Sequence, residues 1–178
     1  MSKPPPVRSS ETPSLDVEIV VEDEHWHVLG DVEGIVGAAA DALSSLRADL
    51  FDGATAATVM LADDAHVASL NGTFRGKPAP TNVLSFPAGV LGTGDGAPRY
   101  LGDIILARET VEREAREQDI AVAHHIQHLT VHGILHLIGF DHLTDDDAAE
   151  MEAIETSVLA SLGVPDPYAP ELFEPATK

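Results

Sequence analysis

The sequence predicts an α+β (mixed α/β) domain in which a small four-stranded mixed sheet packs against about five helices. Three observations support this class. The chain has 178 residues and is 44% hydrophobic, which suits one soluble domain with a substantial core. Short runs rich in β-branched residues alternate with longer segments of helical periodicity. Their order is strand, helix, strand, helix, strand, strand and then helices, which favours helices packed on a mixed sheet.

The N-terminal half is predicted to contain two strands and two helices. The first strand alternates and is rich in β-branched residues. Asp31 is a typical N-cap for the alanine-rich amphipathic helix that follows, and Asp63 or Asp64 caps the next helix. The expected strands cover residues 15–21 and 55–61, and the expected helices run from Asp31 to about residue 50 and from the second cap to about residue 74.

The segment that begins at residue 70 is expected to lose regular structure, because two glycines and two prolines fall within nine residues. It would place Arg75 and Lys77 together on a loop, where functional side chains are often displayed. A short strand follows at 82–86, and the glycine-rich stretch 89–98 reads as a mobile, hairpin-like loop.

The C-terminal half is predicted to contain one strand and three helices. The helix at 108–118 has Glu109–Arg113 and Glu112–Arg116 spaced for ion pairs one turn apart. Thr144 caps the last helix, whose acidic first turn complements the helix dipole. That helix is expected to bury Met151, Ile154, Val158 and Leu162. The strand is expected at 100–107 and the remaining long helix from residue 120 or 121 to Gly139.

The ends of the chain are predicted to lie outside the folded domain. Residues 1–14 are rich in proline and serine, lack the apolar core of a signal peptide and are expected to be a disordered extension. Prolines at 165, 167, 170 and 175 make 164–178 an irregular tail, which leaves a single domain at 15–163. No apolar run is long enough to cross a membrane, so we expect a cytoplasmic protein.

The charge of the chain argues against a general nucleic-acid binder. The formal net charge is −20, with 30 acidic and 10 basic residues, whereas non-specific binding to phosphates requires a basic surface. Acidic side chains gather between Asp145 and Glu155, and most of the basic ones lie in the interior of the sequence. At physiological salt a charge acts over only about 8–10 Å. A basic patch can therefore still attract a polyanion if the fold keeps the acidic side chains away from it.

The strongest functional signal is the pattern HxxxHxxGxxH formed by His132, His136, Gly139 and His142. Residues four apart share one helix face, so the first two imidazoles can bind one metal ion. Gly139 allows a turn that returns His142 to the same ion. Three imidazoles with an open fourth position describe a catalytic zinc site, and the absence of cysteine excludes a thiolate site. We therefore expect one zinc ion per chain.

The same helix lacks the catalytic base of a zinc peptidase. Peptidases with the HExxH motif carry a glutamate after the first histidine, and here that position is Gly133. The ligand spacing is metzincin-like, yet a hydrolase acting on something other than peptides is the better interpretation. His128 lies one turn before His132 on the same stripe, and an orienting or packing role is expected for it. His124 and His125 receive no assignment.

Three blocks of sequence carry a further signal. They are Leu70-Asn71 with Phe74-Arg75-Gly76-Lys77, the stretch from Pro80 to Pro87 (PTNVLSFP), and the stretch from His128 to His142, which ends in Phe140-Asp141-His142. The strand start Gly102-Asp103-Ile104 also fits. Together these blocks resemble the YbeY family of bacterial endoribonucleases, over roughly residues 15–162. The chain departs from that family in its proline-rich extension, its glycine loop and its acidity.

The resemblance implies a metal-dependent hydrolase that cuts single-stranded RNA. It also implies a part in maturation of ribosomal RNA, at the 3′ end of the small-subunit RNA, and in ribosome quality control. The family's zinc ligands map onto His132, His136 and His142, and its important arginine maps onto Arg75. The expected partners are ribosomal RNA and the small subunit, with a ribosomal protein and an assembly GTPase as further candidates.

As a mechanism, we hypothesise attack on phosphorus by water activated at the metal. Arg75 would stabilise the charge that develops in the transition state, and Lys77 would steer the RNA backbone. Asp141 is expected to orient an imidazole, as is His128. Two other functions remain open: a peptidase-like metal hydrolase, and a ribosome-assembly factor whose zinc is structural and whose acidity suits a basic partner.

Overall fold

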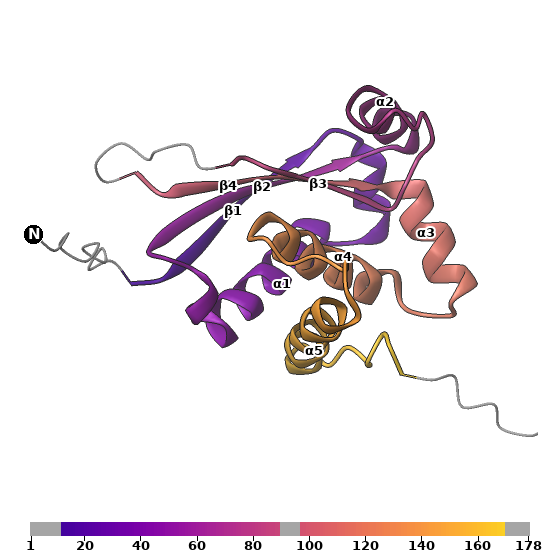
Figure 1. Cartoon of the computed structure of the whole chain (residues 1–178). Coiled ribbons are helices and arrows are strands. Elements are labelled where there is room, and N and C mark those ends of the chain that lie inside the picture. Colours follow the sequence, from indigo (N-terminus) through magenta and orange to yellow (C-terminus); the bar gives the residue numbers. More distant parts are fainter. Residues whose placement is uncertain (1–11, 90–96, 170–178) are drawn as a thin grey trace, which may run out of the picture.

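A four-stranded mixed sheet packed with helices forms the framework of the protein, as predicted, and the helices lie on both of its faces (Figure 1). The computed structural model describes residues 12–89 and 97–169. The strand order is β1-β2-β4-β3, in which β1, β2 and β4 run parallel and β3 is an antiparallel edge strand. The strands are β1 (Ser14–Val21), β2 (Ala54–Ala62), β3 (Val83–Pro87) and β4 (Arg99–Ala107).

The two central strands show why the sequence forms a sheet here. From Thr55 to Leu61 every second residue of β2 is buried and those between are half-buried, which is the pattern of a strand with one face packed into the core. The register between β2 and β4 shifts at Ala56/Ala57, which leaves Leu101 as an extra residue. Next to it, Gly102 has a φ of +135°, and a Cβ there would lie 2.2 Å from the carbonyl oxygen of Phe86. Glycine is thus required where β3 and β4 approach each other.

In the described residues, five α-helices pack around the sheet, with two short 3₁₀ segments beside them. The expected caps are confirmed: Asp31, Asp63 and Thr144 each accept a hydrogen bond from a backbone N–H in the first turn. The helices are α1 (Val32–Leu46), α2 (Asp64–Arg75), α3 (Arg108–Glu117), α4 (Val122–Leu137) and α5 (Asp145–Ser161), and the 3₁₀ segments are η1 (Glu24–Leu29) and η2 (Ala48–Leu50).

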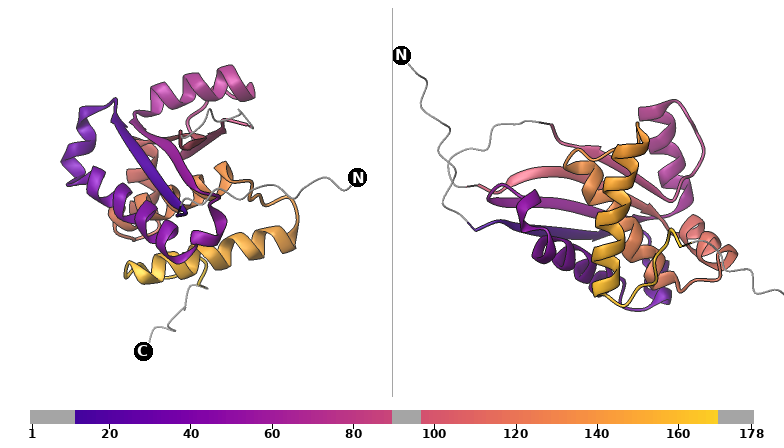
Figure 2. Two further views of the ribbon diagram at one scale, coloured as in Figure 1. Left: turned by 90° about the vertical axis from the view of Figure 1, so that its left-hand side faces the viewer. Right: turned by 60° about the horizontal axis from the view of Figure 1, so that its bottom comes forward.

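The helices form unequal layers on the two faces of the sheet (Figures 1 and 2). Helices α1 and α4 lie against one face, and α5 packs on their outer side. Helix α2 lies on the opposite face, over a small separate core that includes Val67 and Leu84. The main core lies between the sheet and α1, α4 and α5 and includes Trp26, whose indole N–H donates to the carbonyl of Ala62 at 2.9 Å. Helix α4 is therefore held by the sheet and by α1, α3 and α5.

The helix predicted to reach about residue 74 is confirmed, so the expectation that the chain is irregular from residue 70 is wrong for its first part. Helix α2 continues through Gly72 to Arg75 and ends at Gly76, which adopts the left-handed conformation with φ +67°. Gly72 is tolerated because Pro78 packs on it: a Cβ at position 72 would lie only 3.2 Å from the Cβ of Pro78. Arg75 is consequently the last residue of a helix, and of the two predicted loop residues only Lys77 lies on the loop.

The ion pairs of α3 also differ from the expected ones. Arg108 pairs with Glu112 at 2.8 Å and Arg113 with Glu117 at 3.9 Å, so the pairs have the predicted spacing but a different register. Arg108 is drawn to Asp23, which accepts from its Nε at 2.6 Å. This contact lowers the pKa of Asp23 to about 2 against the opposing effect of burial.

The predicted chain ends and the glycine loop fall mostly outside the described residues. Of the extension at 1–14, residues 1–11 lie outside them, and Ser14 already begins β1. Of the loop at 89–98, residues 90–96 lie outside them. Of the tail at 164–178, residues 164–169 are described and contain neither helix nor strand.

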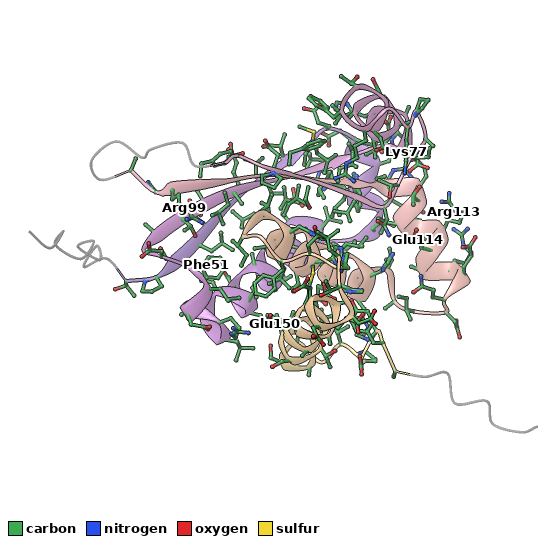
Figure 3. All side chains as sticks on the ribbon, in the orientation of Figure 1. Phe51, Lys77, Arg99, Arg113, Glu114 and Glu150 are labelled. Atoms are coloured by element: carbon green, nitrogen blue, oxygen red, sulfur yellow. The ribbon has the colours of Figure 1, made fainter. Side chains whose placement is uncertain are left out.

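The fold places some of the acidic side chains away from the basic ones. Figure 3 shows Lys77 at the end of α2 on one side of the sheet and Glu150 on α5 on the other. A polyanion that approaches from the α2 side therefore does not meet the acidic helix first. In the described part of the chain, no helix combines the length and the apolar character needed to cross a membrane.

Gly133 sets the distance between α4 and the sheet, which leads to a first prediction. A Cβ at this position would lie 2.9 Å from Cγ2 of the buried Ile104. Overpacking by the added methyl group should cost about 1–3 kcal/mol of stability. Alanine is favoured over glycine in a helix by only about 0.5–1 kcal/mol. We therefore expect Gly133→Ala to destabilise the protein. Thermal unfolding measures this effect as a lower Tm.

Gly37 in α1 is the matched control for Gly133, because a Cβ there would meet nothing within 4 Å. Gly37→Ala should raise the Tm by helix propensity alone. An equal rise for Gly133→Ala would contradict the close contact between α4 and Ile104.

Candidate metal centre

Three histidine nitrogens converge at the C-terminal end of α4. His132 and His136 lie on one face of the helix, and His142 returns to them after a turn at Gly139, which has a φ of +104°. Nε2 of His136 lies 3.1 Å from Nε2 of His132 and 3.1 Å from Nε2 of His142. The structure thus brings together the three residues that the sequence spacing singled out.

Hydrogen bonds at the opposite ring nitrogens fix how these imidazoles face one another. Nδ1 of His136 donates to the carbonyl oxygen of Phe140 at 2.9 Å, and Nδ1 of His132 donates to Oε1 of Glu155 at 2.7 Å. In the neutral rings Nε2 is then unprotonated and carries a lone pair. Burial lowers the pKa of His136, and the charges of His132 and His142 lower it further, which favours the neutral form.

This donor set fits a metal ion. Unprotonated nitrogens that face each other at 3.1 Å repel unless a cation lies between them. A tetrahedral zinc ion with Zn–N bonds of about 2.0–2.1 Å would place its nitrogens about 3.3 Å apart, close to the spacing seen here. Three imidazoles with no thiolate leave a fourth position for water or substrate, as in catalytic zinc sites.

The three histidines open into a cavity of about 540 Å³ that Arg75 also lines. Arg75 reaches it from the end of α2, around the edge strand β3, and among the described residues it forms no ion pair. Lys77 is not among the lining residues of this cavity, although it follows two positions later. The described residues that line it are Arg75, Asn82, Val83, Ser85, Pro87, His132, His136, Gly139, Phe140, Asp141 and His142.

The other two candidate residues lie beside the centre in different ways. Asp141 lines the cavity, and its Oδ1 accepts from the backbone N–H of His142 at 2.7 Å. It therefore fixes the backbone of a candidate ligand, and not an imidazole ring as was expected for it. His128 lies one turn before His132 and donates from Nε2 to Oε2 of Glu155 at 3.1 Å. Glu155 thus links His128 to His132.

Glu155 and Tyr168 are parts of the site that were not predicted from the sequence. Glu155 of α5 is fully buried and bonds both His128 and His132. The Tyr168 hydroxyl donates to the same carboxylate. Burial alone would raise the pKa of Glu155, but hydrogen bonds from His128, His132 and Tyr168 outweigh it and lower the pKa to about 2. Burial and the adjacent carboxylate raise the pKa of Tyr168.

A second cavity of about 490 Å³ adjoins the first, since both are lined by Asn82, Val83 and His132. Its wall includes His125, which is buried and donates from Nε2 to Glu114 at 2.8 Å. Burial lowers the pKa of His125, although Glu114 opposes this effect. His125, which had no assignment from sequence, thus belongs to a polar contact that joins α3 and α4.

Comparison with known proteins identifies relatives over most of the chain. The family model described as Endoribonuclease YbeY matches residues 20–163. A protein named Endoribonuclease YbeY from Azorhizobium caulinodans is 50% identical over 156 residues, which cover 87% of this chain and 97% of that one. Its namesake from Maricaulis maris is 48% identical over 155 residues, covering 87% and 92%.

The fold has a counterpart among solved structures. The solution structure of TM1509 from Thermotoga maritima matches with a TM-score of 0.50 at 21% identity, covering 91% of this chain and 99% of that one. This likeness concerns the fold, while the sequence matches identify the relatives. The resemblance inferred from the three sequence blocks is confirmed. The chain belongs to the endoribonuclease YbeY family.

Proposed function

We propose that this protein is a zinc-dependent endoribonuclease that cuts single-stranded RNA. Its proposed role is the maturation of ribosomal RNA, at the 3′ end of the small-subunit RNA, and ribosome quality control in the cytoplasm. The observation that carries the proposal is the meeting of three histidine Nε2 atoms and Arg75 in one cavity. Membership of an endoribonuclease family supports RNA as the substrate.

The chain supplies the ligands of the proposed zinc ion and holds them in place. His132, His136 and His142 would bind it through Nε2, with the Phe140 carbonyl and Glu155 fixing two of the rings. A zinc ion bound there would activate water near neutral pH and polarise a phosphoryl oxygen.

Arg75 is the proposed group for the transition state. Its guanidinium has planar N–H donors that match two phosphoryl oxygens, and it lines the same cavity as the histidines without a carboxylate partner among the described residues. Charge that develops on the phosphoryl oxygens would be stabilised by these donors. Lys77, on the loop after α2, is proposed to attract the RNA backbone further from the reacting bond.

The packing of α4 argues against peptidase activity. A peptidase of this type places its catalytic glutamate where this chain has Gly133, and Ile104 leaves no room for a Cβ at that position. The rival function as a ribosome-assembly factor has one supporting observation, the exposed acidic first turn of α5, which suits a basic ribosomal protein. We propose such a protein, the small subunit and an assembly GTPase as partners of the same enzyme.

Removal of the metal tests the proposal. Purified protein should contain about one zinc per chain, measured by elemental analysis, and cut a single-stranded RNA but not the corresponding duplex. Dialysis against a chelator should abolish cleavage, and one equivalent of zinc should restore it, because three neutral histidines would bind the ion reversibly. Metal-free protein that cuts RNA at the original rate would refute zinc-dependent catalysis. Zinc-loaded protein that cuts no RNA would favour the assembly-factor function.

A further inference from the structure

Three histidines form a stripe along α4, yet only His132 and His136 line the cavity that Arg75 and His142 also line. His128, His132 and His136 follow one another at intervals of one helical turn. His132 and His136 face His142 through their Nε2 atoms, whereas His128 faces Glu155. Since all three have the same chemistry, something outside α4 must distinguish His128 from the other two.

The two oxygens of Glu155 make this distinction. Oε1 accepts from Nδ1 of His132 at 2.7 Å, which leaves Nε2 of that ring free to bind a metal. Oε2 accepts from Nε2 of His128 at 3.1 Å and so occupies a nitrogen with which His128 would bind one. Glu155 is fully buried, so its carboxylate has little freedom to rotate away from this arrangement.

Tyr168 holds Glu155 in turn. Its hydroxyl donates to Oε2 of Glu155 and lies 3.2 Å from Nε2 of His128. Its ring also packs edge-on against His128, with the ring centroids 5.6 Å apart. The segment after α5 thereby touches the group that orients a candidate ligand. The low pKa of Glu155 agrees with a carboxylate that stays charged among these donors.

We propose that Glu155, held by Tyr168, is a positioning residue that selects which histidines bind the metal. It presents Nε2 of His132 to the ion and keeps His128 away from it, so that one coordination position stays open for water or RNA. Hydrogen bonds of this kind commonly affect metal affinity about 10–100-fold. The inference rests on the proposed zinc site and deepens it.

A different use of the same atoms makes a distinct prediction. His128, His132 and Glu155 lie close enough to hold a cation themselves. If they did so alongside the first site, the protein would bind two zinc ions per chain, and removing His128 would lower that number to one. The proposal requires one zinc per chain both in the wild type and in His128→Ala.

The test compares zinc affinity by chelator competition in the wild type, Glu155→Ala, Glu155→Gln and Tyr168→Phe. Glu155→Ala should weaken zinc binding about 10–100-fold, with smaller losses for Glu155→Gln, which retains one acceptor, and for Tyr168→Phe. Glu150→Ala is the matched control, because it removes an exposed carboxylate from the same helix and should leave zinc affinity unchanged.

Cobalt absorption gives a second readout that does not depend on activity. With cobalt in place of zinc, the visible bands change in position and shape when a histidine nitrogen replaces a water ligand. Glu155→Ala should release His128 to bind and so change the visible spectrum. Adding His128→Ala should restore the wild-type spectrum while the affinity stays low, since His132 remains unoriented.

The outcomes separate this inference from the proposed function. A wild type that binds one zinc, with unchanged affinity and spectrum in the Glu155 variants, would overturn the inference alone. A wild type that binds no zinc would overturn both. If Glu155→Ala does not fold, Glu155→Gln and Tyr168→Phe test the inference in its place. Zinc affinity and cobalt spectra equal to those of the wild type in both variants would refute the positioning role.

Discussion

Replacement of His136 by alanine should remove zinc and RNA cleavage together. Nε2 of this residue lies 3.1 Å from the Nε2 atoms of both His132 and His142, so it is the central member of the three. Two remaining imidazoles, one of them on an exposed loop residue, would hold the ion weakly. Loss of the several kcal/mol that a metal supplies to phosphoryl transfer predicts a fall in kcat/KM of about 1,000-fold or more.

Elemental analysis and cleavage of single-stranded RNA, on protein whose fold is checked by circular dichroism, measure this loss. His66→Ala is the matched control, because His66 is an exposed histidine of α2 that lies outside the lining of both cavities. It should behave as the wild type. A folded His136→Ala protein that still cuts RNA would assign the activity to another protein in the preparation. If that variant also supported ribosome maturation in cells, the assembly-factor function would replace the enzymatic one.

The positions of the three histidines could be predicted largely from their spacing in the sequence. His132 and His136 are four residues apart within a helix, so their common face follows from helix geometry alone. Gly139 then accounts for the return of His142, because its φ of +104° is one that other residues rarely adopt. Both inferences depend only on neighbours along the chain, and such local geometry can be predicted without knowing the fold.

Glu155 could not be placed by the same reasoning, although the sequence held a signal. It lies in a run of acidic residues, which suggests a solvated surface. It also lies four residues after Met151 and three before Val158, which puts it on the apolar face of α5. A carboxylate on a buried face needs partners, and these come from α4 and from Tyr168. Only the tertiary packing of α5 against α4 brings them together.

The position of Arg75 also could not be predicted from the local sequence. Glycine and proline composition indicated an irregular segment, but the contact between Gly72 and Pro78 keeps the last turn of α2 in place. Tertiary contacts thus outweighed local propensity. The consequence for function is that Arg75 reaches the lining of the cavity from the end of a packed helix, which fixes its backbone more firmly than a loop would.

Replacement of Arg75 by alanine should therefore lower catalysis strongly while leaving zinc bound. Arg75 lines the cavity but is not one of the nitrogen donors, so the metal content should stay at that of the wild type. Removing one group that stabilises transition-state charge typically lowers kcat about 100–1,000-fold. Single-turnover cleavage of a short single-stranded RNA, at saturating enzyme, measures this step apart from binding.

Two further variants separate catalysis from attraction of the RNA. Arg75→Lys keeps the charge but loses the planar pair of donors, so its rate should fall between those of the wild type and Arg75→Ala. Lys77→Ala removes a charge that does not line the cavity. It should weaken binding and reduce its salt dependence, with little change in the single-turnover rate. Equal effects of Arg75→Ala and Lys77→Ala on binding alone would show that Arg75 only attracts the RNA, and the transition-state role would then be wrong.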